Sequence, residues 1–244
     1  MPFSLKKTIK KILVTTFFKH IRSSYAQSGE DIIISDLFSH LNIQNPTYLD
    51  IGANDPIALS NTYRLYKRGS KGVCVEPNPV LCKKIQQKRK RDTCLNVGVA
   101  FDERKEADFY VFPEKFNGLN TFSKEEAGFW EHTGNEEIGM HKVEKVIKMK
   151  LVHINEIIEQ YFSPHPNFVS IDVEGLDFHI LKSLDFSKYK PEVFCIETLG
   201  FIENNKEIKK IEILDFLKEH GYFVYADTYI NTIFCLKSAY KNLA

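Results

Sequence analysis

The chain has 244 residues, with 33 Lys and Arg against 32 Asp and Glu, and a formal net charge of +1. This length suffices for one large α/β domain whose core needs neither a metal nor a disulfide. Because the charges balance, no overall field draws the protein toward nucleic acid, and the composition disfavours a nucleic-acid-binding function.

The first 24 residues are predicted to form a basic amphipathic helix. Residues 1–22 carry six basic side chains and no acidic one. Apolar residues recur at helical spacing at Leu5, Ile9, Ile12, Leu13 and Phe17. The apolar run "ILVTTFF" is too short to span a bilayer, and no small-residue cleavage site follows it. Two interpretations stay open: the helix packs on the domain or a partner, or it lies on a membrane surface.

Residues 25–244 are predicted to form a single domain in which strands and helices alternate. A helix begins after Ser28 and Gly29, where Glu30 and Asp31 give it an acidic first turn. The first expected strands cover residues 47–51, 72–77 and 93–100, with helices at 58–69 and 78–91 between them. These strands are almost continuously apolar, which is typical of a parallel sheet buried on both faces.

The stretch from residue 102 to 150 interrupts this alternation. "ADFYVFP" is strand-like, "NGLNTFS" is loop-like, and the polar remainder contains Gly128, Gly134 and Gly139. Long connections of this kind usually carry function or are disordered. We therefore expect an insertion that acts as a lid or recognises the substrate.

Alternation resumes after the insertion and ends in a hairpin. The expected helices cover residues 154–162, 177–186 and 204–221, and the expected strands 167–175, 192–198, 222–228 and 231–237. The last two strands are separated by two residues and are predicted to pair antiparallel at the sheet edge. The five cysteines form no C-x-x-C pair, which indicates buried thiols in a reducing compartment and a cytoplasmic protein. A place at the inner face of the membrane is the alternative that the N-terminal helix leaves open.

The stretch "YLDIGANDP" follows the pattern of a cofactor loop with a single glycine, Gly52. A dinucleotide fingerprint has three glycines, which let the backbone approach a pyrophosphate, and Asp55 would repel that group. The loop therefore counts against NAD and nucleoside triphosphates. Asp50 and Glu76 end consecutive strands, where a carboxylate can accept both hydroxyls of a ribose. S-adenosylmethionine fits, because it has a nucleoside and no phosphate; the alternative is a helix cap at Asp50 and a surface ion pair at Glu76.

Several ordered blocks resemble the FkbM family of S-adenosylmethionine-dependent methyltransferases. They are "YAQSGED", "YLDIGANDP…SNTYRLYKRGSKGVCVEPNP", "LNVGVA" and "FVSIDVEGLDFHILKSLDF…PEVFCIET". The resemblance implies a Rossmann-like class I methyltransferase fold, an α/β architecture with a seven-stranded, mostly parallel sheet and one antiparallel strand. It also implies methylation of hydroxyl oxygens, often on sugars or secondary metabolites, in bacterial glycan biosynthesis.

The resemblance also implies roles for particular residues. Asp50, Gly52 and Asn54 would line the methionine end of the cofactor, and Glu76 would hold its ribose. The other implied cofactor-binding residues are Asn78 near the adenosine, Asn96 and Val97 at the adenine, and Gln27 to Glu30 as a segment closing over the cofactor.

The reaction centre is expected in "SIDVEGLDFH". Methyl transfer to an alcohol needs a group that takes the hydroxyl proton. Asp172 and Glu174 stand two apart at a strand end and face one way, Glu197 closes the neighbouring strand, and His179 is a further candidate base. Asp172, Glu174 and Glu197 are also a candidate site for Mg²⁺ or Mn²⁺. The alternative is that Glu174 and Glu197 bind substrate hydroxyls without a metal.

The sequence thus predicts an O-methyltransferase that acts on a hydroxyl of a sugar, sugar nucleotide or glycan. A non-catalytic binding or scaffold protein on the same fold is the alternative.

Overall fold

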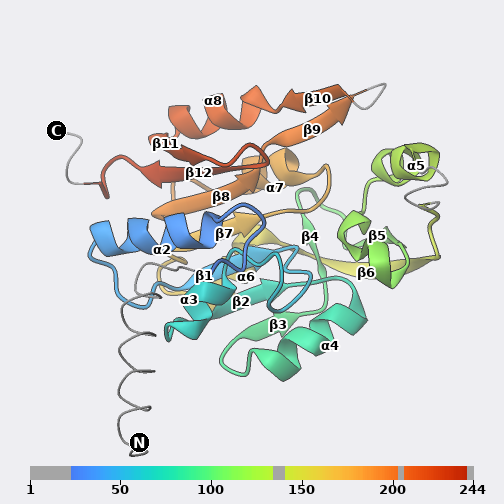
Figure 1. Cartoon of the computed structure of the whole chain (residues 1–244), viewed down its shortest axis with the longest axis horizontal. Helices are drawn as coiled ribbons and strands as arrows, with labels where there is room; N and C mark the ends of the chain where they lie inside the picture. The colour runs from blue at the N-terminus through green and yellow to red at the C-terminus, as the bar shows by residue number, and fades with distance from the viewer. Residues whose placement is uncertain (1–22, 134–140, 203–205, 241–244) are drawn as a thin grey trace, which may run out of the picture.

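The computed structural model describes residues 23–133, 141–202 and 206–240, and a seven-stranded sheet forms their centre (Figure 1). Its strands in spatial order are β11 (Tyr222–Asp227), β12 (Asn231–Leu236), β8 (Val193–Glu197), β7 (Phe168–Ile171), β1 (Tyr48–Ile51), β2 (Gly72–Val75) and β3 (Thr93–Leu95). Within this sheet β12 runs antiparallel to both its neighbours, and the other pairs are parallel. The fold is the Rossmann-like methyltransferase architecture, as expected.

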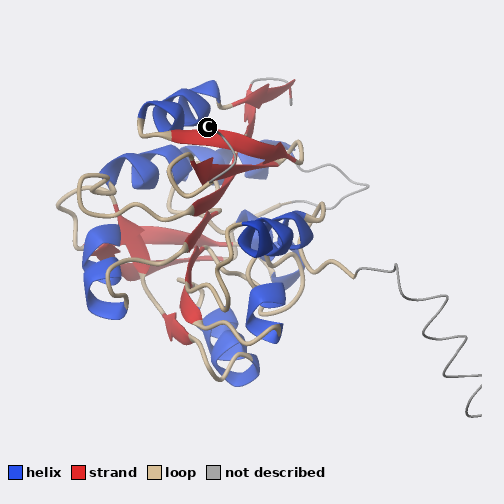
Figure 2. Cartoon of the chain, turned by 90° about the vertical axis from the view of Figure 1, so that its left-hand side faces the viewer, coloured by secondary structure: helices blue, strands red, loops and turns tan. Residues whose placement is uncertain are grey.

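Helices cover both faces of the sheet, which Figure 2 shows from the side. The helices on one face are α2 (Glu30–His40), α3 (Tyr63–Lys67) and α4 (Pro79–Lys88), and those on the other are α6 (Ile154–Tyr161), α7 (Asp177–Ser183) and α8 (Ile211–Glu219). Strand alternation explains the two cores: Leu49 and Ile51 pack toward α6, α7 and α8, whereas Tyr48 packs toward α2 and α3. All four residues of β1 are buried, as the continuous apolar strands predicted.

The terminal hairpin is confirmed. Strands β11 and β12 pair antiparallel, with a register shift between Val224 and Ala226, and β11 forms the edge of the sheet. The connection has three residues, 228–230, one more than the sequence indicated, and holds Tyr229 at a positive φ of 76°.

The insertion is more ordered than the sequence indicated. It contains β5 (Glu106–Val111), the 3-10 helix η1 (Glu114–Leu119), α5 (Lys124–Thr133) and β6 (Lys145–His153). The expected strand 93–100 divides into β3 and β4 (Gly98–Ala100), and β4 pairs with β6 in a separate three-stranded sheet. Strand β6 was missed because most of its side chains are exposed or half-buried, so no apolar run marks it. This insertion stands at one side of the main sheet in Figure 1.

The expected helix 204–221 was wrong in its first part. Strand β10 (Lys206–Lys209) pairs with β9 (Leu199–Ile202) in a two-stranded arm, and α8 follows only from Ile211. Ile208 has the β-branched side chain that suits a strand, but the surrounding charges masked this signal.

The predicted N-terminal helix lies almost wholly outside the described residues, which begin at residue 23. Among the described residues, every helix falls short of the length and apolar character that a bilayer crossing requires.

Candidate active site

A cavity of about 350 Å³ opens at the carboxyl ends of β1, β2, β7 and β8. This is where ligands bind in open α/β sheets, because successive loops diverge there. One wall comes from the insertion, through Asn117, Asn120, Phe122 and Trp130. The cavity is thus enclosed by the central sheet and by the segment that interrupts it.

Gly52 allows the two sheet loops to meet at the floor of the cavity. Its φ is +81°, and a Cβ atom placed on it would lie 1.8 Å from the carbonyl oxygen of Asp172. Its backbone nitrogen donates to the carbonyl of Val75 at 3.0 Å. The single glycine of the loop is therefore required by contact between protein segments, and this contact explains it without any phosphate.

Glu76 organises the cofactor loop through both carboxylate oxygens. The backbone nitrogen of Asn54 donates to Oε2 at 2.8 Å, and that of Asn78 donates to Oε1 at 2.7 Å. The side chain is 4% exposed, and burial raises its pKa to about 7, although the two backbone donors oppose the shift. Each oxygen keeps a further lone pair, so the carboxylate can still accept hydroxyl groups from a ligand.

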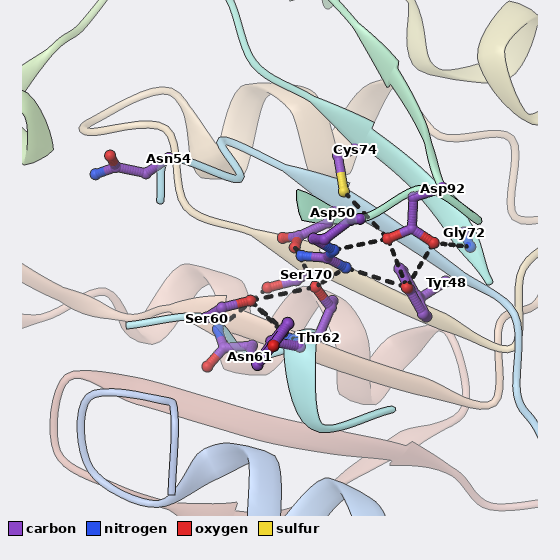
Figure 3. A network of polar contacts seen from close by, with 12 residues as sticks. Tyr48, Asp50, Asn54, Ser60, Asn61, Thr62, Gly72, Cys74, Asp92 and Ser170 are labelled. Carbon is purple, nitrogen blue, oxygen red and sulfur yellow. Dashed lines mark hydrogen bonds and ion pairs between the residues drawn. The ribbon is translucent and has the colours of Figure 1, made fainter. Parts of the chain in front are cut away.

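Asp50 is buried under the same loop. It accepts a hydrogen bond from Thr62 Oγ1, and Asn61 Nδ2 donates to Ser170 Oγ at 3.1 Å (Figure 3). Burial raises the pKa of Asp50, while the charge of Arg89 and the Thr62 hydroxyl act in the opposite direction. The segment "SNT" thus supports the sheet end beneath the cavity.

Three further carboxylates line the cavity from the ends of β7 and β8. Asp172 and Glu174 follow β7, Glu197 ends β8, and all three line the cavity. Burial, and then the neighbouring Asp177, raises the pKa of Asp172 to about 7. Burial and mutual repulsion raise the pKa of Glu174 and of Glu197 well above the ordinary value.

The loop that carries these carboxylates is fixed from two sides. Asp177 Oδ1 accepts from the backbone nitrogen of Val173 at 3.0 Å, and its Oδ2 is 3.3 Å from Lys210 Nζ. Thr121 of the insertion donates to the carbonyl of Glu174 at 2.9 Å, and Glu174 has a positive φ of 53°. The insertion therefore contacts the predicted reaction centre directly.

The cavity is acidic. Its lining includes the carboxylates of Asp50, Glu76, Asp172, Glu174 and Glu197, and no Lys, Arg or His of the described chain. Lys210 lies behind the wall, 3.7 Å from Glu197 Oε2. Such a lining suits a cationic ligand and disfavours phosphates.

Most predicted site residues line this cavity. They are Gln27, Asp50, Gly52, Asn54, Glu76, Val97, Asp172, Glu174 and Glu197. The structure does not bring Glu30, Asn78, Asn96 or His179 to its surface.

Each of these four has another contact. Glu30 is buried and accepts from Thr228 Oγ1 at 2.6 Å, and Asn78 caps α4 by accepting from the backbone nitrogen of Val80 at 3.0 Å. Asn96 Nδ2 donates to the carbonyls of Glu76 and Pro77. These three residues hold the cavity walls from behind.

His179 is exposed on α7, and its ring centroid lies 5.0 Å from that of Phe101. A helical position predicts the face of a side chain only when the packing of that helix is known. The structure therefore places this histidine away from the other candidate catalytic residues.

The metal hypothesis finds no support. Among the described residues, no three His, Cys, Asp or Glu side chains are gathered so as to hold an ion. Asp172, Glu174 and Glu197 line one cavity and influence one another's pKa, but they do not form such a group.

Sequence reasoning missed polar atoms that the folded chain leaves without a partner. Asn120 Nδ2, Asn231 Oδ1 and Asn54 Oδ1 are buried, have no hydrogen-bond partner, and belong to residues that line the cavity. The backbone nitrogen of Phe112 donates to Asn120 Oδ1 at 2.8 Å and so fixes the orientation of the Asn120 side chain. Buried amides of this kind normally find partners, so a ligand is the natural one. The available signal was the polar stretch "NGLNTFS".

Comparisons with known proteins identify the family of the chain. The methyltransferase FkbM domain matches residues 50–224 of the chain. No curated protein matches it.

Solved structures of methyltransferases resemble the fold. A TehB-like S-adenosylmethionine-dependent methyltransferase from Corynebacterium glutamicum is 9% identical, with 96% of this chain and 97% of that one covered and a TM-score of 0.43. The 1,6-didemethyltoxoflavin-N1-methyltransferase from Burkholderia thailandensis, bound to S-adenosylhomocysteine, is 9% identical, with 96% and 88% covered and a TM-score of 0.41. Magnesium protoporphyrin IX methyltransferase from Synechocystis, with bound S-adenosylmethionine, is 10% identical, with 94% of each chain covered and a TM-score of 0.39.

Proposed function

Because the chain belongs to the FkbM methyltransferase family, and is therefore an S-adenosylmethionine-dependent methyltransferase, we propose that it methylates a hydroxyl of a sugar or glycan. The observation that carries this proposal is that Asp172, Glu174 and Glu197 line the same cavity as the loop held by Glu76. A hydroxyl is a weak nucleophile, and these carboxylates offer the bases and acceptors that it needs.

The cofactor half of the proposal rests on charge and on free lone pairs. S-adenosylmethionine supplies a methyl group on a positively charged sulfur, together with an ammonium group and a ribose. All the candidate residues of this half line the cavity, namely Gln27, Asp50, Gly52, Asn54, Glu76 and Val97. In the proposal, Glu76 accepts the ribose hydroxyls and Asp50 receives the ammonium group. Five carboxylates without a lining cation favour such a cation.

Asp172 is our candidate for the general base. Its pKa of about 7 gives it a substantial ionised fraction at neutral pH while it still binds a proton well. S-adenosylmethionine, when bound, would supply the methyl group and leave as S-adenosylhomocysteine, and the Asp172 carboxylate would take the proton of the acceptor hydroxyl. Glu174 and Glu197 then accept hydrogen bonds from neighbouring hydroxyls and orient the acceptor.

The same acidic lining restricts the acceptor. A sugar nucleotide would bring a diphosphate against carboxylates, with no described Lys, Arg or His on the cavity surface to receive it. An uncharged sugar or glycan avoids this repulsion and can pair with the free amide atoms of Asn120 and Asn231. We therefore favour the uncharged acceptor over the sugar nucleotide, and the five unpaired cysteines support a cytoplasmic site of action.

The test has two stages. Calorimetric titration with S-adenosylhomocysteine should show binding, and its absence would contradict the cofactor assignment. Release of S-adenosylhomocysteine is then followed with uncharged glycans and with matched nucleotide-linked sugars. The proposal is supported if an uncharged glycan is turned over and the product bears the new methyl group on an oxygen. A product methylated on nitrogen or carbon, or turnover confined to nucleotide-linked sugars, would overturn it.

A further inference from the structure

Arg89 is the one fully buried arginine in the described part of the chain, and it lies beneath the candidate cofactor site. Its side chain is 0% exposed at the end of α4. Nε donates to Asp92 Oδ2 at 2.7 Å, and Nη2 donates to Tyr48 Oη at 3.1 Å and to Thr62 Oγ1 at 2.9 Å. Nη1 lies 3.8 Å from Asp50 Oδ2 and has no hydrogen-bond partner. Burying a cation is costly unless it is paired, so this position needs an explanation.

Asp92 compensates the charge of Arg89 from behind. It is itself fully buried, and it also accepts from Tyr48 Oη at 2.8 Å and from the backbone nitrogen of Gly72 at 3.0 Å (Figure 3). The Arg89–Asp92 pair is therefore neutral and held by several donors. Because Asp92 balances Arg89, Asp50 is not needed to neutralise the guanidinium, whose Nη1 lies 3.8 Å from Asp50 Oδ2.

Thr62 connects the guanidinium to Asp50. A hydroxyl has one proton to donate, and the Thr62 hydroxyl accepts from Arg89 while it donates to Asp50 Oδ2. The Arg89 donor thereby fixes the direction of the Thr62 proton. Among the described residues no donor contacts Asp50 Oδ1, and Asp50 lines the cavity.

We propose that Arg89 is a positioning residue for cofactor binding: acting through Thr62, it keeps Asp50 a carboxylate and leaves the Oδ1 atom of Asp50 for the cofactor's ammonium group. The proposal rests on the proposed function, since it requires S-adenosylmethionine in this cavity. It also gives "SNTY" a role, because Thr62 is the link between a buried ion pair and the ligand.

The charged groups around Asp50 set the direction of its response to pH. Glu76 and Asp172 approach from the cavity side, and Asp92 and Cys74 stand on the side of Arg89. Burial and the Asp92 carboxylate favour protonation of Asp50, whereas Arg89 and the Thr62 hydroxyl oppose it. Loss of the Thr62 hydroxyl should therefore shift protonation of Asp50 to higher pH.

The experiment measures S-adenosylhomocysteine binding from pH 5 to 9 in the full chain. Thr62→Val should weaken binding about tenfold at neutral pH, the loss expected for one hydrogen bond to a charged group, and should move the pH midpoint of binding upward. Thr62→Ser should restore both. Thr232→Val is the matched control, because Thr232 is fully buried and its hydroxyl bonds Thr198 at 2.6 Å outside the cavity lining.

Arg89→Lys and the double variant test whether Arg89 acts through Thr62. If it does, Arg89→Lys with Thr62→Val should bind within about twofold of the weaker single variant, because both remove the same link. Additive losses would overturn the relay. Unchanged affinity and midpoint in Thr62→Val would overturn the positioning role while leaving the proposed function intact. Failure of the wild type to bind would instead refute the cofactor assignment itself.

Discussion

The two halves of the cavity satisfy their polar groups in different ways. In the cofactor half, Glu76 accepts two backbone hydrogen bonds, and Asp50 is supported by Thr62 and Arg89. In the proposed acceptor half, burial and neighbouring carboxylates raise the pKa values of Asp172, Glu174 and Glu197, and Asn120 and Asn231 have unpaired amide atoms, as Asn54 does in the proposed cofactor half. Under the proposed assignment, the carboxylates of the first half are held by the protein itself, whereas the second half leaves more of its polar groups for a ligand.

This difference indicates which residues determine the affinity for the cofactor and which take part in proton transfer. Groups held by the protein itself lose little freedom when the cofactor binds, so changes there should act on binding. Carboxylates with raised pKa values are kept ready to take a proton, so changes there should act on turnover. Variants of one half should therefore change binding, and variants of the other should change turnover.

The largest effect is expected from Gly52→Ala. The added Cβ would lie 1.8 Å from the Asp172 carbonyl oxygen, at a φ of +81°. Since neither backbone segment can yield by that much, the loop must move, and S-adenosylhomocysteine binding should fall below detection by calorimetry. The left-handed conformation adds about 1–2 kcal/mol of destabilisation, measurable by denaturant unfolding.

Two further glycines separate the causes. In Gly29→Ala the added Cβ meets no atom within 4 Å, but the residue has a φ of +93°. The loss of stability in this variant therefore measures the cost of the left-handed backbone conformation alone. Gly128→Ala in α5 meets no atom within 4 Å and has no such φ, so it should leave binding unchanged and raise the free energy of unfolding by up to about 1 kcal/mol, because alanine is the better helix former. Binding by Gly52→Ala at wild-type strength would show that this contact does not shape the cofactor loop.

The next effect is expected from Asp172→Asn. Asparagine keeps the size of the side chain but cannot take the hydroxyl proton, so kcat should fall by about 10²–10⁴. Affinity for S-adenosylhomocysteine should stay within a few-fold, because Asp172 belongs to the acceptor half. Rapid-quench turnover and calorimetry measure the two quantities. Full activity in this variant would move the reaction centre away from Asp172.

The sequence predicted the sheet and the cofactor half better than the acceptor half, for physical reasons. Continuous apolar runs that end at or next to Asp50 and Glu76 predict buried parallel strands and the positions of their carboxyl ends. The register that brings Asp172 against Gly52 follows from β1 and β7 pairing, which the sequence supports only through strand order. In contrast, Asn120 and Trp130 reach the cavity because the insertion packs against the sheet. No local hydrophobic or polar pattern in the sequence predicts that packing. His179 shows the converse, since proximity along the chain did not place its ring in the cavity.

The third effect is a change in the pH dependence of stability in Glu76→Gln. Burial raises the folded pKa of Glu76 from 4.5 to about 7, so between these values the folded chain holds a proton that the unfolded chain has lost. The stability from this group is full below pH 4.5 and declines as pH rises to 7, by at most ~3 kcal/mol. Denaturant unfolding of the ligand-free protein should show a flatter decline in Glu76→Gln. An unaltered slope would contradict the raised pKa.

Glu114→Gln is the control for the pH dependence of stability in Glu76→Gln. Glu114 is strongly exposed and pairs with Lys84 at 2.8 Å, so a surface carboxylate is neutralised without touching the cavity. It should leave the decline between pH 4.5 and 7 in place. Asp172 titrates in the same range from the acceptor half, so part of the slope should remain in Glu76→Gln.

The smallest effect is expected from Trp130→Ala on the insertion. Trp130 lines the acceptor wall, and loss of its ring should raise KM for a glycan acceptor about tenfold, which corresponds to ~1.4 kcal/mol. S-adenosylhomocysteine affinity should be unchanged, because the ring does not belong to the cofactor loop. Phe129→Ala is the control on the same helix: its ring packs 5.1 Å from Trp130 but does not line the cavity, so KM should move less. If Trp130→Ala weakened cofactor binding as strongly as acceptor binding, the cavity would act as one unit, and the division into two halves would fail.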